Sequence, residues 1–199
     1  TTDEDKLRAL RREIDAIDDS LHDLIIERTR VVERVREAKK GDKIKIRPAR
    51  EAEILYRLMA RHSGAFPKRE LSRMWREMII ATLRFEGPFS VSVFVSEDDV
   101  GYGDLARDQY GSFTPMTRHV SSRAVIEAVG SGEATVGILP MPRPDESEHW
   151  WQLLVTEVPD SPRIIARLPF IAGDNSPGAK LDALVVGIVG QEETGRDRS

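Results

Sequence analysis

The amino-acid sequence predicts two parts of different class, an all-α unit of three helices over residues 1–87 and an α/β unit over residues 88–190. Three observations predict this division. Residues 6–40 contain neither glycine nor proline and repeat apolar residues every three or four positions, as a helix does. Proline and glycine then mark out two shorter helices before Gly87 and Pro88. After Pro88, short strand-like and helical runs are mixed, which is typical of an α/β fold.

The composition excludes several classes of protein. The chain has 199 residues, of which 40% are hydrophobic and 32% charged, and it carries a net charge of −4. No apolar run approaches the ~20 residues that span a bilayer, so we expect no membrane partner. The negative charge argues against a nucleic-acid partner. No apolar segment follows a basic start, so no secretory signal is expected and the predicted location is cytoplasmic.

The residue types that hold metals or form covalent intermediates are scarce. Cysteine is absent, which excludes disulfides and thiolate chemistry. The four histidines lie far apart, without the spacing of metal ligands. We therefore expect neither a metal nor any other cofactor.

Residues 6–40 are predicted to form one helix of unusual length. At ~1.5 Å per residue it extends about 52 Å, farther than a compact domain of this size is wide. Its apolar positions form one stripe: Leu7, Leu10, Ile14, Ile17, Leu21, Leu24, Val31, Val35 and Ala38. The two helices that follow are too short to cover this stripe, so we expect a second copy of the chain beside it. A two-stranded coiled coil is the alternative.

The remaining elements follow from proline positions and apolar patterns. A second helix begins at Pro48, and a third begins at Pro67. The α/β unit is predicted to contain strands at residues 89–95, 134–139, 163–168 and 184–189, and helices at residues 105–110 and 122–129. Residues 174–180 form a turn-rich loop, and residues 191–199 are a polar tail or a point of truncation.

Two cations interrupt the apolar stripe of the long helix. Steps of three or four residues from Leu24 arrive at Arg28 and later at Lys39. These two cations lie on one helix face, about 16 Å apart. Arg11 borders the same stripe but lies about 25 Å from Arg28 along the axis, so it reaches the same ligand only from an antiparallel partner helix. The cations favour a small dicarboxylate bound between two subunits.

The alternative is that each cation extends to solvent or pairs with a nearby acid such as Asp15, Glu27 or Glu37. Several inward cations would then need several buried acids of their own. For a single cation, this alternative is the better explanation. For the whole set, a bound dicarboxylate is the better explanation, because a buried charge without a partner is costly.

Four further polar residues lie on the second and third helices. Arg50 and Glu51 stand near the start of the second, and Thr82 and Glu86 share a face near the end of the third. Taken alone, Thr82 and Glu86 are better explained as surface and helix-end residues. Taken together, the set supplies donors and carboxyl groups without a nucleophile or a histidine. Such a set suits the positioning and electrostatic stabilisation of a substrate.

The order and spacing of these residues resemble the all-helical chorismate mutases. The likeness covers residues 6–87 and rests on four motifs: LRREIDAID at 10–18, LIIER at 24–28, AK at 38–39 and RPARE at 47–51. The resemblance implies an intertwined homodimer of three-helix chains. It also implies a cofactor-free isomerase that converts chorismate to prephenate, a step of the shikimate pathway to phenylalanine and tyrosine.

The resemblance further implies a role for each candidate residue. Arg28, with Arg11 of the other subunit, would hold the two carboxylates of the substrate. Lys39 would face a carboxylate and the ether oxygen of the breaking bond. Arg50 would be the arginine that the second helix contributes to the pocket, and Glu51 would bind the substrate hydroxyl.

The third helix would complete the implied site. Thr82 falls where the family has a small hydroxyl residue near a carboxylate, and Glu86 falls where members carry Gln or Glu facing the ether oxygen. To donate a hydrogen bond to that oxygen, Glu86 must be protonated. Arg47 departs from the pattern, because some members have an acid there, and this leaves the orientation of Glu51 open.

The second half is similar to a decayed first lobe of the prephenate dehydratases, over residues 89–172. The likeness lies in the strand after Pro88, GYGDLA at 101–106, YG at 110–111 and the pattern of residues 125–140. The Gly-Pro-x-Gly element of that family is replaced by SEDD at 96–99, its Glu-Asn pair by MPRP at 141–144, and its Thr-Arg-Phe triplet is absent. A working dehydratase is therefore not expected. The alternatives to a mutase are a bifunctional mutase and dehydratase, and a non-catalytic helical dimer that binds a small dicarboxylate.

Overall fold

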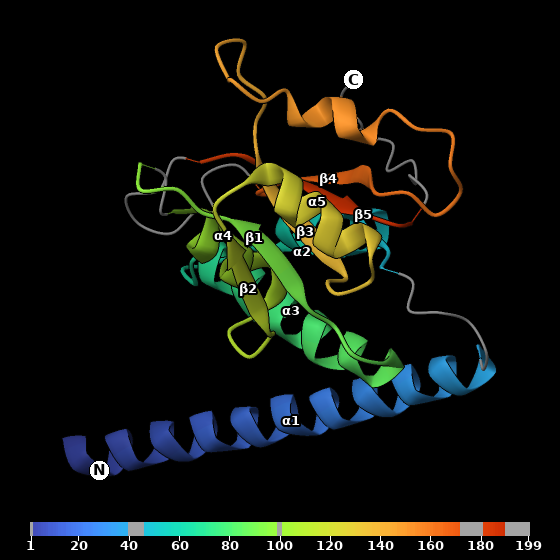
Figure 1. The fold of residues 1–199 in the computed structure, drawn as a ribbon. Coiled ribbons are helices and arrows are strands. Elements are labelled where there is room, and N and C mark those ends of the chain that lie inside the picture. The colour runs from blue at the N-terminus through green and yellow to red at the C-terminus, as the bar shows by residue number, and fades with distance from the viewer. Residues whose placement is uncertain (1, 40–45, 99–100, 172–180, 190–199) are drawn as a thin grey trace. The chain divides into compact units, whose positions relative to one another are not determined.

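The computed structural model describes residues 2–39, 46–98, 101–171 and 181–189 (Figure 1). The chain divides into two compact units, residues 1–43 and residues 44–199. Among the residues in the described ranges, no helix is both long and apolar enough to cross a membrane. The predicted loop at 174–180 and the predicted tail at 191–199 lie outside these ranges.

The described part of the first unit is one long helix, α1, which spans Asp3–Ala38. Thr2 caps its N-terminus through a capping box with Asp5. Acidic residues in the first turn complement the positive end of the helix dipole. The long helix predicted from the sequence is confirmed, and it begins three residues earlier than the apolar pattern indicates.

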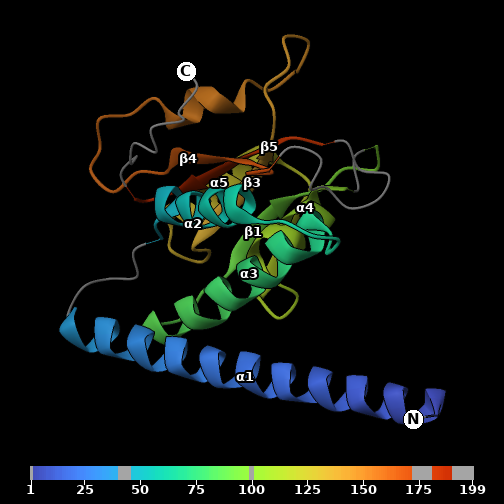
Figure 2. The same cartoon turned by 180° about the vertical axis from the view of Figure 1, so that it is seen from behind.

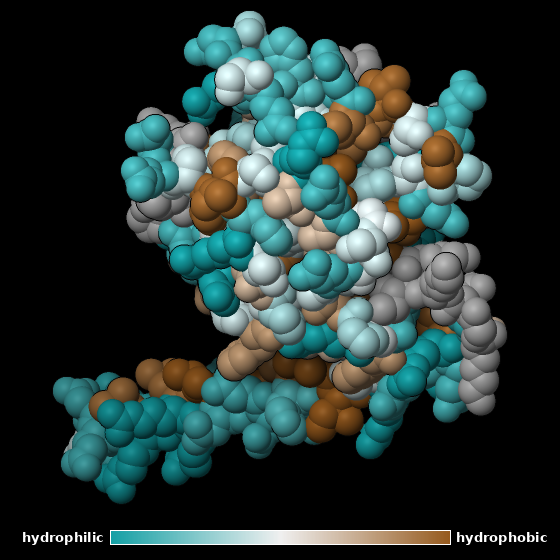
Figure 3. Space-filling model, in the orientation of Figure 1, coloured by the Kyte–Doolittle hydropathy of each residue, from teal (hydrophilic) through white to brown (hydrophobic). Residues whose placement is uncertain are grey.

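The apolar stripe of α1 is exposed along its length. None of the described residues of α1 is buried. The stripe residues range from 43% exposed at Val31 to 59% exposed at Leu24, and Figure 3 shows apolar side chains along this helix. Because most of the stability of a helix comes from packing its apolar face, this surface needs a partner.

The second unit begins with two shorter helices, α2 (Pro48–Arg61) and α3 (Lys68–Leu83), followed by the 3-10 turn η1 (Arg84–Glu86). Pro48 occupies the first position of α2, where the backbone N–H group that proline lacks would have no hydrogen-bond partner within the helix. Both predicted helices are present. They belong to the same compact unit as the sheet that follows, and the predicted domain boundary between residues 87 and 88 stays a prediction.

A five-stranded mixed sheet forms the centre of the second unit, with strand order β2-β1-β3-β5-β4. The strands are β1 (Val91–Phe94), β2 (Met116–His119), β3 (Val136–Pro140), β4 (Arg163–Leu168) and β5 (Ala183–Gly187). Strand β1 is parallel to β2 and β3, whereas β5 is antiparallel to β3 and β4. Helices α4 (Gly101–Tyr110) and α5 (Ser122–Gly130) connect the parallel strands, and the 3-10 segment η2 (Trp150–Leu154) precedes β4.

Each face of the sheet carries its own hydrophobic core. Because side chains alternate along a strand, Ile138 and Val185 join one cluster while Leu139 and Val186 join the other. The first cluster includes Ile80 of α3 and the apolar face of α4, and the second includes α5 and η2. Figures 1 and 2 show α5 on one side of the sheet and α2 and α3 on the opposite side. The two shorter helices therefore pack as an outer layer of the α/β fold.

Two elements differ from the sequence prediction. The pattern does not predict β2, because this edge strand has the polar sequence Met-Thr-Arg-His and pairs on one side only. Helix α4 begins at Gly101 rather than Leu105. Burial of Tyr102, which is 2% exposed, outweighs the low helix propensity of the flanking glycines.

The substitution Gly137→Ala in β3 should lower the free energy of unfolding by ~1–3 kcal/mol. A Cβ atom at this position would lie 2.7 Å from Cγ1 of Val125 and 2.9 Å from Cγ2 of Val186. The matched control is Gly103→Ala in α4, where a new Cβ atom has its nearest neighbour, a nitrogen of Arg118, at 3.8 Å. Urea unfolding measures both variants, and equal stability of the two would contradict the prediction.

Candidate functional site

Three of the predicted site residues belong to α1 and its C-cap: Arg11, Arg28 and Lys39. Arg11 and Lys39 are exposed. Arg28 is half-buried, and burial lowers the pKa of its guanidinium group. Its Nη1 atom is buried and has no hydrogen-bond partner among the described residues. A partly desolvated cation with an unsatisfied donor is completed by a bound anion.

Arg50, the predicted site residue at the start of α2, forms a surface ion pair. Its Nη1 donates to Oε2 of Glu53 at 2.7 Å, and the two side chains are 53% and 61% exposed. Exposed pairs of this kind contribute only ~0.2–1 kcal/mol, so Glu53 is a weak competitor for another anion near Arg50.

Glu51 lies on the buried face of α2, together with Pro48, Ala52 and Leu55. It is 8% exposed, and burial raises the pKa of its carboxyl group from 4.5 to about 7. The pKa of Tyr110 in α4 is raised mainly by burial, and the charge of Glu51 raises it further. Glu51 therefore changes its charge near neutral pH, within electrostatic range of a buried phenol.

The end of α3 carries Thr82 and Glu86. Thr82 is 7% exposed, and its hydroxyl donates to the carbonyls of Met78 at 3.1 Å and Ile79 at 2.9 Å. Glu86 is half-buried in η1, which ends at Gly87 with a φ of 145°. Glu86 thus lies beyond the end of α3, and the shared helix face that the four-residue spacing predicts for Thr82 and Glu86 stays a prediction.

The seven predicted residues fall in both compact units. Three belong to the first unit and four to the second. Within the second unit, Thr82 lies in the last turn of α3 and Glu86 in η1, whereas Arg50 faces solvent and Glu51 faces the core. The assignment of all seven residues to one site stays a prediction.

Sequence reasoning misses the residues that surround this part of the second unit. Tyr110 is remote in sequence from Glu51, and no local pattern connects them. The charged residues Arg73, Glu77 and Arg84 look like solvated helix residues, yet each contacts α4 or the loop after it. The signal that indicates their role is their shared helix face with the buried Ile80.

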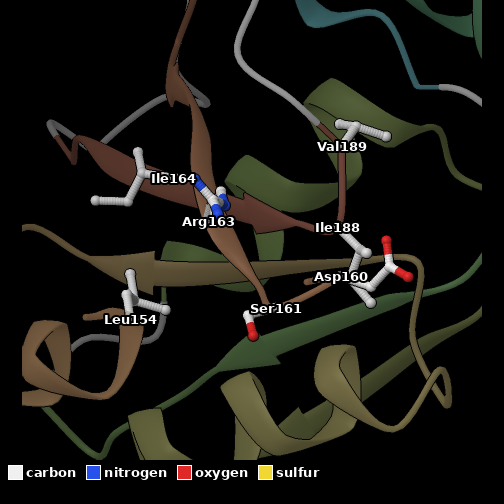
Figure 4. Close-up of a pocket in the computed structure, with 7 residues that line it drawn as sticks. All are labelled: Leu154, Asp160, Ser161, Arg163, Ile164, Ile188 and Val189. Carbon is white, nitrogen blue, oxygen red and sulfur yellow. The ribbon is translucent and has the colours of Figure 1, made fainter. Parts of the chain in front are cut away.

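A cavity of about 480 Å³ lies at the edge of the sheet and contains none of the predicted residues (Figure 4). It is lined by Leu154, Asp160, Ser161, Arg163, Ile164, Ile188 and Val189. Its volume is in the range of small-molecule pockets. Neither here nor elsewhere in the described ranges do three His, Asp or Glu side chains gather as metal ligands.

Comparison with known families gives a match for the helical part of the chain. Residues 10–87 match the family model described as chorismate mutase type II. The match begins in α1, contains α2 and α3 and ends directly after η1, so it includes every predicted site residue.

Three curated relatives are each named bifunctional chorismate mutase/prephenate dehydratase. The protein of Pseudomonas aeruginosa is 29% identical over 145 residues, which are 70% of this chain and 40% of the relative. The proteins of Stutzerimonas stutzeri and Aquifex aeolicus are each 28% identical over 69% of this chain and 39% of the relative. The alignments are longer than the family match, so they extend into the α/β region. The chain spans about 40% of the length of these relatives.

The buried carboxyl group of Glu51 should make stability depend on pH. The folded chain binds this proton more tightly than the unfolded chain, because burial raises the pKa from 4.5 to about 7. The stabilisation is therefore complete below pH 4.5 and is lost as the pH rises through about 7. The substitution Glu51→Gln removes the titration and should gain up to ~3 kcal/mol over the parent between pH 5 and pH 8. Urea unfolding at several pH values measures this gain, and a constant difference between the two proteins would refute it.

Proposed function

We propose that the chain catalyses the rearrangement of chorismate to prephenate, because residues 10–87 match the family model of chorismate mutase type II. The family match carries the proposal, because it covers the helices on which the predicted cations lie. The relatives support it, since the name of each includes chorismate mutase as one of two activities.

The chemistry of this rearrangement suits the residues present. One bond breaks and one forms within a single molecule, so no nucleophile is needed. The protein must select a compact conformer of the substrate and stabilise the negative charge that grows on the ether oxygen. Fixed cations in a pocket with little water do both.

In the proposed site, α1 supplies the main contacts to the substrate. Arg28 holds one carboxylate, and its unsatisfied Nη1 supports this role. Lys39 donates to the ether oxygen and to a carboxylate. Arg11 of the second subunit holds the other carboxylate, and Arg50 reaches the substrate from α2 by leaving its exposed pair with Glu53.

The remaining three residues bind the ring substituents and the ether oxygen. Glu86 faces the ether oxygen beside Lys39, to which a carboxyl group can donate only when it carries a proton. Thr82 donates to a carboxylate after its hydroxyl rotates away from the Met78 and Ile79 carbonyls that it contacts in the free chain. Glu51 accepts from the substrate hydroxyl, a role that requires its buried carboxyl group to become accessible.

We assign the proposed site to a homodimer. The exposed apolar stripe of α1 supports this assignment, because an antiparallel α1 from a second copy would cover it. The same arrangement would bring Arg11 of one copy toward Arg28 of the other. We also propose a cytoplasmic location, as the absence of cysteine favours.

Prephenate dehydratase activity is the second candidate. The names of the relatives favour it, and their alignments extend beyond residue 87. The replacement of its Gly-Pro-x-Gly element at residues 96–99 and of its Glu-Asn pair at residues 141–144 argues against it. Formation of phenylpyruvate from prephenate distinguishes the two candidates, and we expect none.

Addition of the protein to chorismate should remove the ultraviolet absorbance of chorismate and yield prephenate. Replacement of Arg28 or Lys39 by Ala should lower kcat/KM by about 100-fold or more, the usual effect of losing one electrostatic donor. Arg34→Ala is the matched control, since Arg34 is exposed on the same helix and lies outside the stripe. An absence of turnover in the parent protein at millimolar substrate would favour the non-catalytic helical dimer.

Mixed dimers test whether Arg11 acts across the interface. Arg11→Ala and Arg28→Ala should each be nearly inactive alone. Co-expression of the two variants should restore about a quarter of the parent sites, because each mixed dimer contains one intact and one doubly altered site. Activity no greater than the mean of the two variants would place both arginines in a site made by one chain.

A further inference from the structure

One side of α3 combines charged residues with a buried apolar one. Arg73, Glu77, Ile80 and Arg84 follow one another at steps of four, three and four residues and therefore share a helix face. Ile80 is 2% exposed and belongs to the cluster of the sheet and α4. The charged residues on this face therefore point toward α4 and the loop that follows it.

The first contact on this face holds the early part of α3. Nη1 of Arg73 donates to Oδ1 of Asp108 at 2.5 Å, and the Asp108 side chain is 7% exposed. A buried carboxylate is costly without a partner, so this pair fixes the distance between α3 and α4.

The second contact depends on a glycine. Oε1 of Glu77 accepts hydrogen bonds from the backbone N–H and the hydroxyl of Ser112, both at 3.1 Å. Gly111 has a φ of 88°, and a Cβ atom there would lie 2.9 Å from Oε2 of Glu77. Glycine thus permits both the turn after α4 and the close approach of the carboxylate.

The third contact joins the end of α3 to the same loop. Nη1 of Arg84 donates to the backbone carbonyl of Phe113 at 3.2 Å. The loop is itself held, because Arg107 donates to the Ser112 carbonyl at 3.0 Å and the Thr114 hydroxyl donates to the Tyr110 carbonyl. Arg84 therefore has a fixed anchor in the α/β part of the chain.

Arg84 stands between the two predicted site residues of α3. Thr82 is in the last turn of the helix, and Glu86 ends the three-residue turn η1. Short 3-10 turns at helix ends fray readily. We propose that Arg84 is a positioning residue, which holds Thr82 and Glu86 in place for the reaction through the Phe113 carbonyl. This inference rests on the proposed mutase function, and it gives the α/β region a role in that reaction.

Steady-state kinetics of the full chain test this role. Arg84→Ala should lower kcat about tenfold, because small displacements of catalytic groups have large effects on rate. KM should change by less than about twofold, since the cations of α1 still bind the carboxylates. Arg84→Lys, which keeps a donor, should recover most of the lost rate. Gly111 lies outside the mutase family match, yet Gly111→Ala should also lower kcat, because a Cβ atom there disturbs the loop that Arg84 contacts.

The matched control is Arg123→Ala in α5. Nε of Arg123 lies 3.2 Å from Oε1 of Glu148 in a pair whose side chains are 52% and 44% exposed. Loss of this surface pair, which is not on α3, should leave kcat and KM unchanged. A loss of kcat in this variant equal to that in Arg84→Ala would mean that any lost surface contact has this effect, and would overturn the proposal.

Hydrogen exchange of backbone amides tests the same contact independently of catalytic activity. Arg84→Ala and Gly111→Ala should speed exchange of the amides of residues 84–87, and Arg123→Ala should not. With an active parent, an unchanged kcat in Arg84→Ala overturns the proposal. An inactive parent overturns the mutase function instead, and unchanged exchange at residues 84–87 overturns the anchoring by Arg84 in either case.

Discussion

The burial of Ile80 between α3 and the sheet is the contact on which the second unit depends. Helices α2 and α3 are too short to be stable alone, and their apolar residues need an external surface. Ile80 of α3 finds it in the cluster that contains Val91, Tyr102 and Tyr110, and Ile46, two residues before α2, joins the same cluster. Tyr56 of α2 adds a hydrogen bond to the Phe170 carbonyl at 3.0 Å. Helix α3 is therefore part of the hydrophobic core of the α/β region, and α2 is joined to that region by the Tyr56 hydrogen bond.

The long helix shows the opposite situation. α1 has a complete N-cap and favourable charges in its first turn, yet none of its described residues is buried. Caps and charges stabilise a helix by only ~1–2 kcal/mol. The apolar stripe, which includes Val31 and Val35, must therefore be stabilised by packing against a surface outside the helix. The same stripe carries the cations, so any surface that packs on the stripe also determines what surrounds Arg28.

The sequence predicts the helices well because their signals are local. Apolar spacing in α1 and the prolines at the starts of α2 and α3 need no tertiary information. Strand β2 has no such signal, because an edge strand with one paired side tolerates polar residues. The early start of α4 depends on the burial of Tyr102, which only the packed fold provides.

The candidate site is predictable in its residue types but not in its surroundings. The stripe indicates that Arg28 and Lys39 share a face, because helical spacing alone determines that. The environment of Glu51 depends on burial beside Tyr110, a residue on a different element. The contacts of Arg84 likewise depend on a loop that follows α4. Electrostatics that arise between distant segments are therefore beyond what local spacing can predict.

The packing of α3 also explains which parts of the dehydratase-like pattern are present in this chain. The replaced elements include Pro142, Arg143 and Pro144 after β3, which are exposed and support no core. The matching residues Tyr102, Leu105, Ala106 and Tyr110 are buried in the same cluster as Ile80. Changes in the former leave the core intact, whereas loss of the latter would remove the surface on which α3 packs. The α/β region can thus be required physically, because it holds the helix that carries Thr82 and leads into the turn with Glu86.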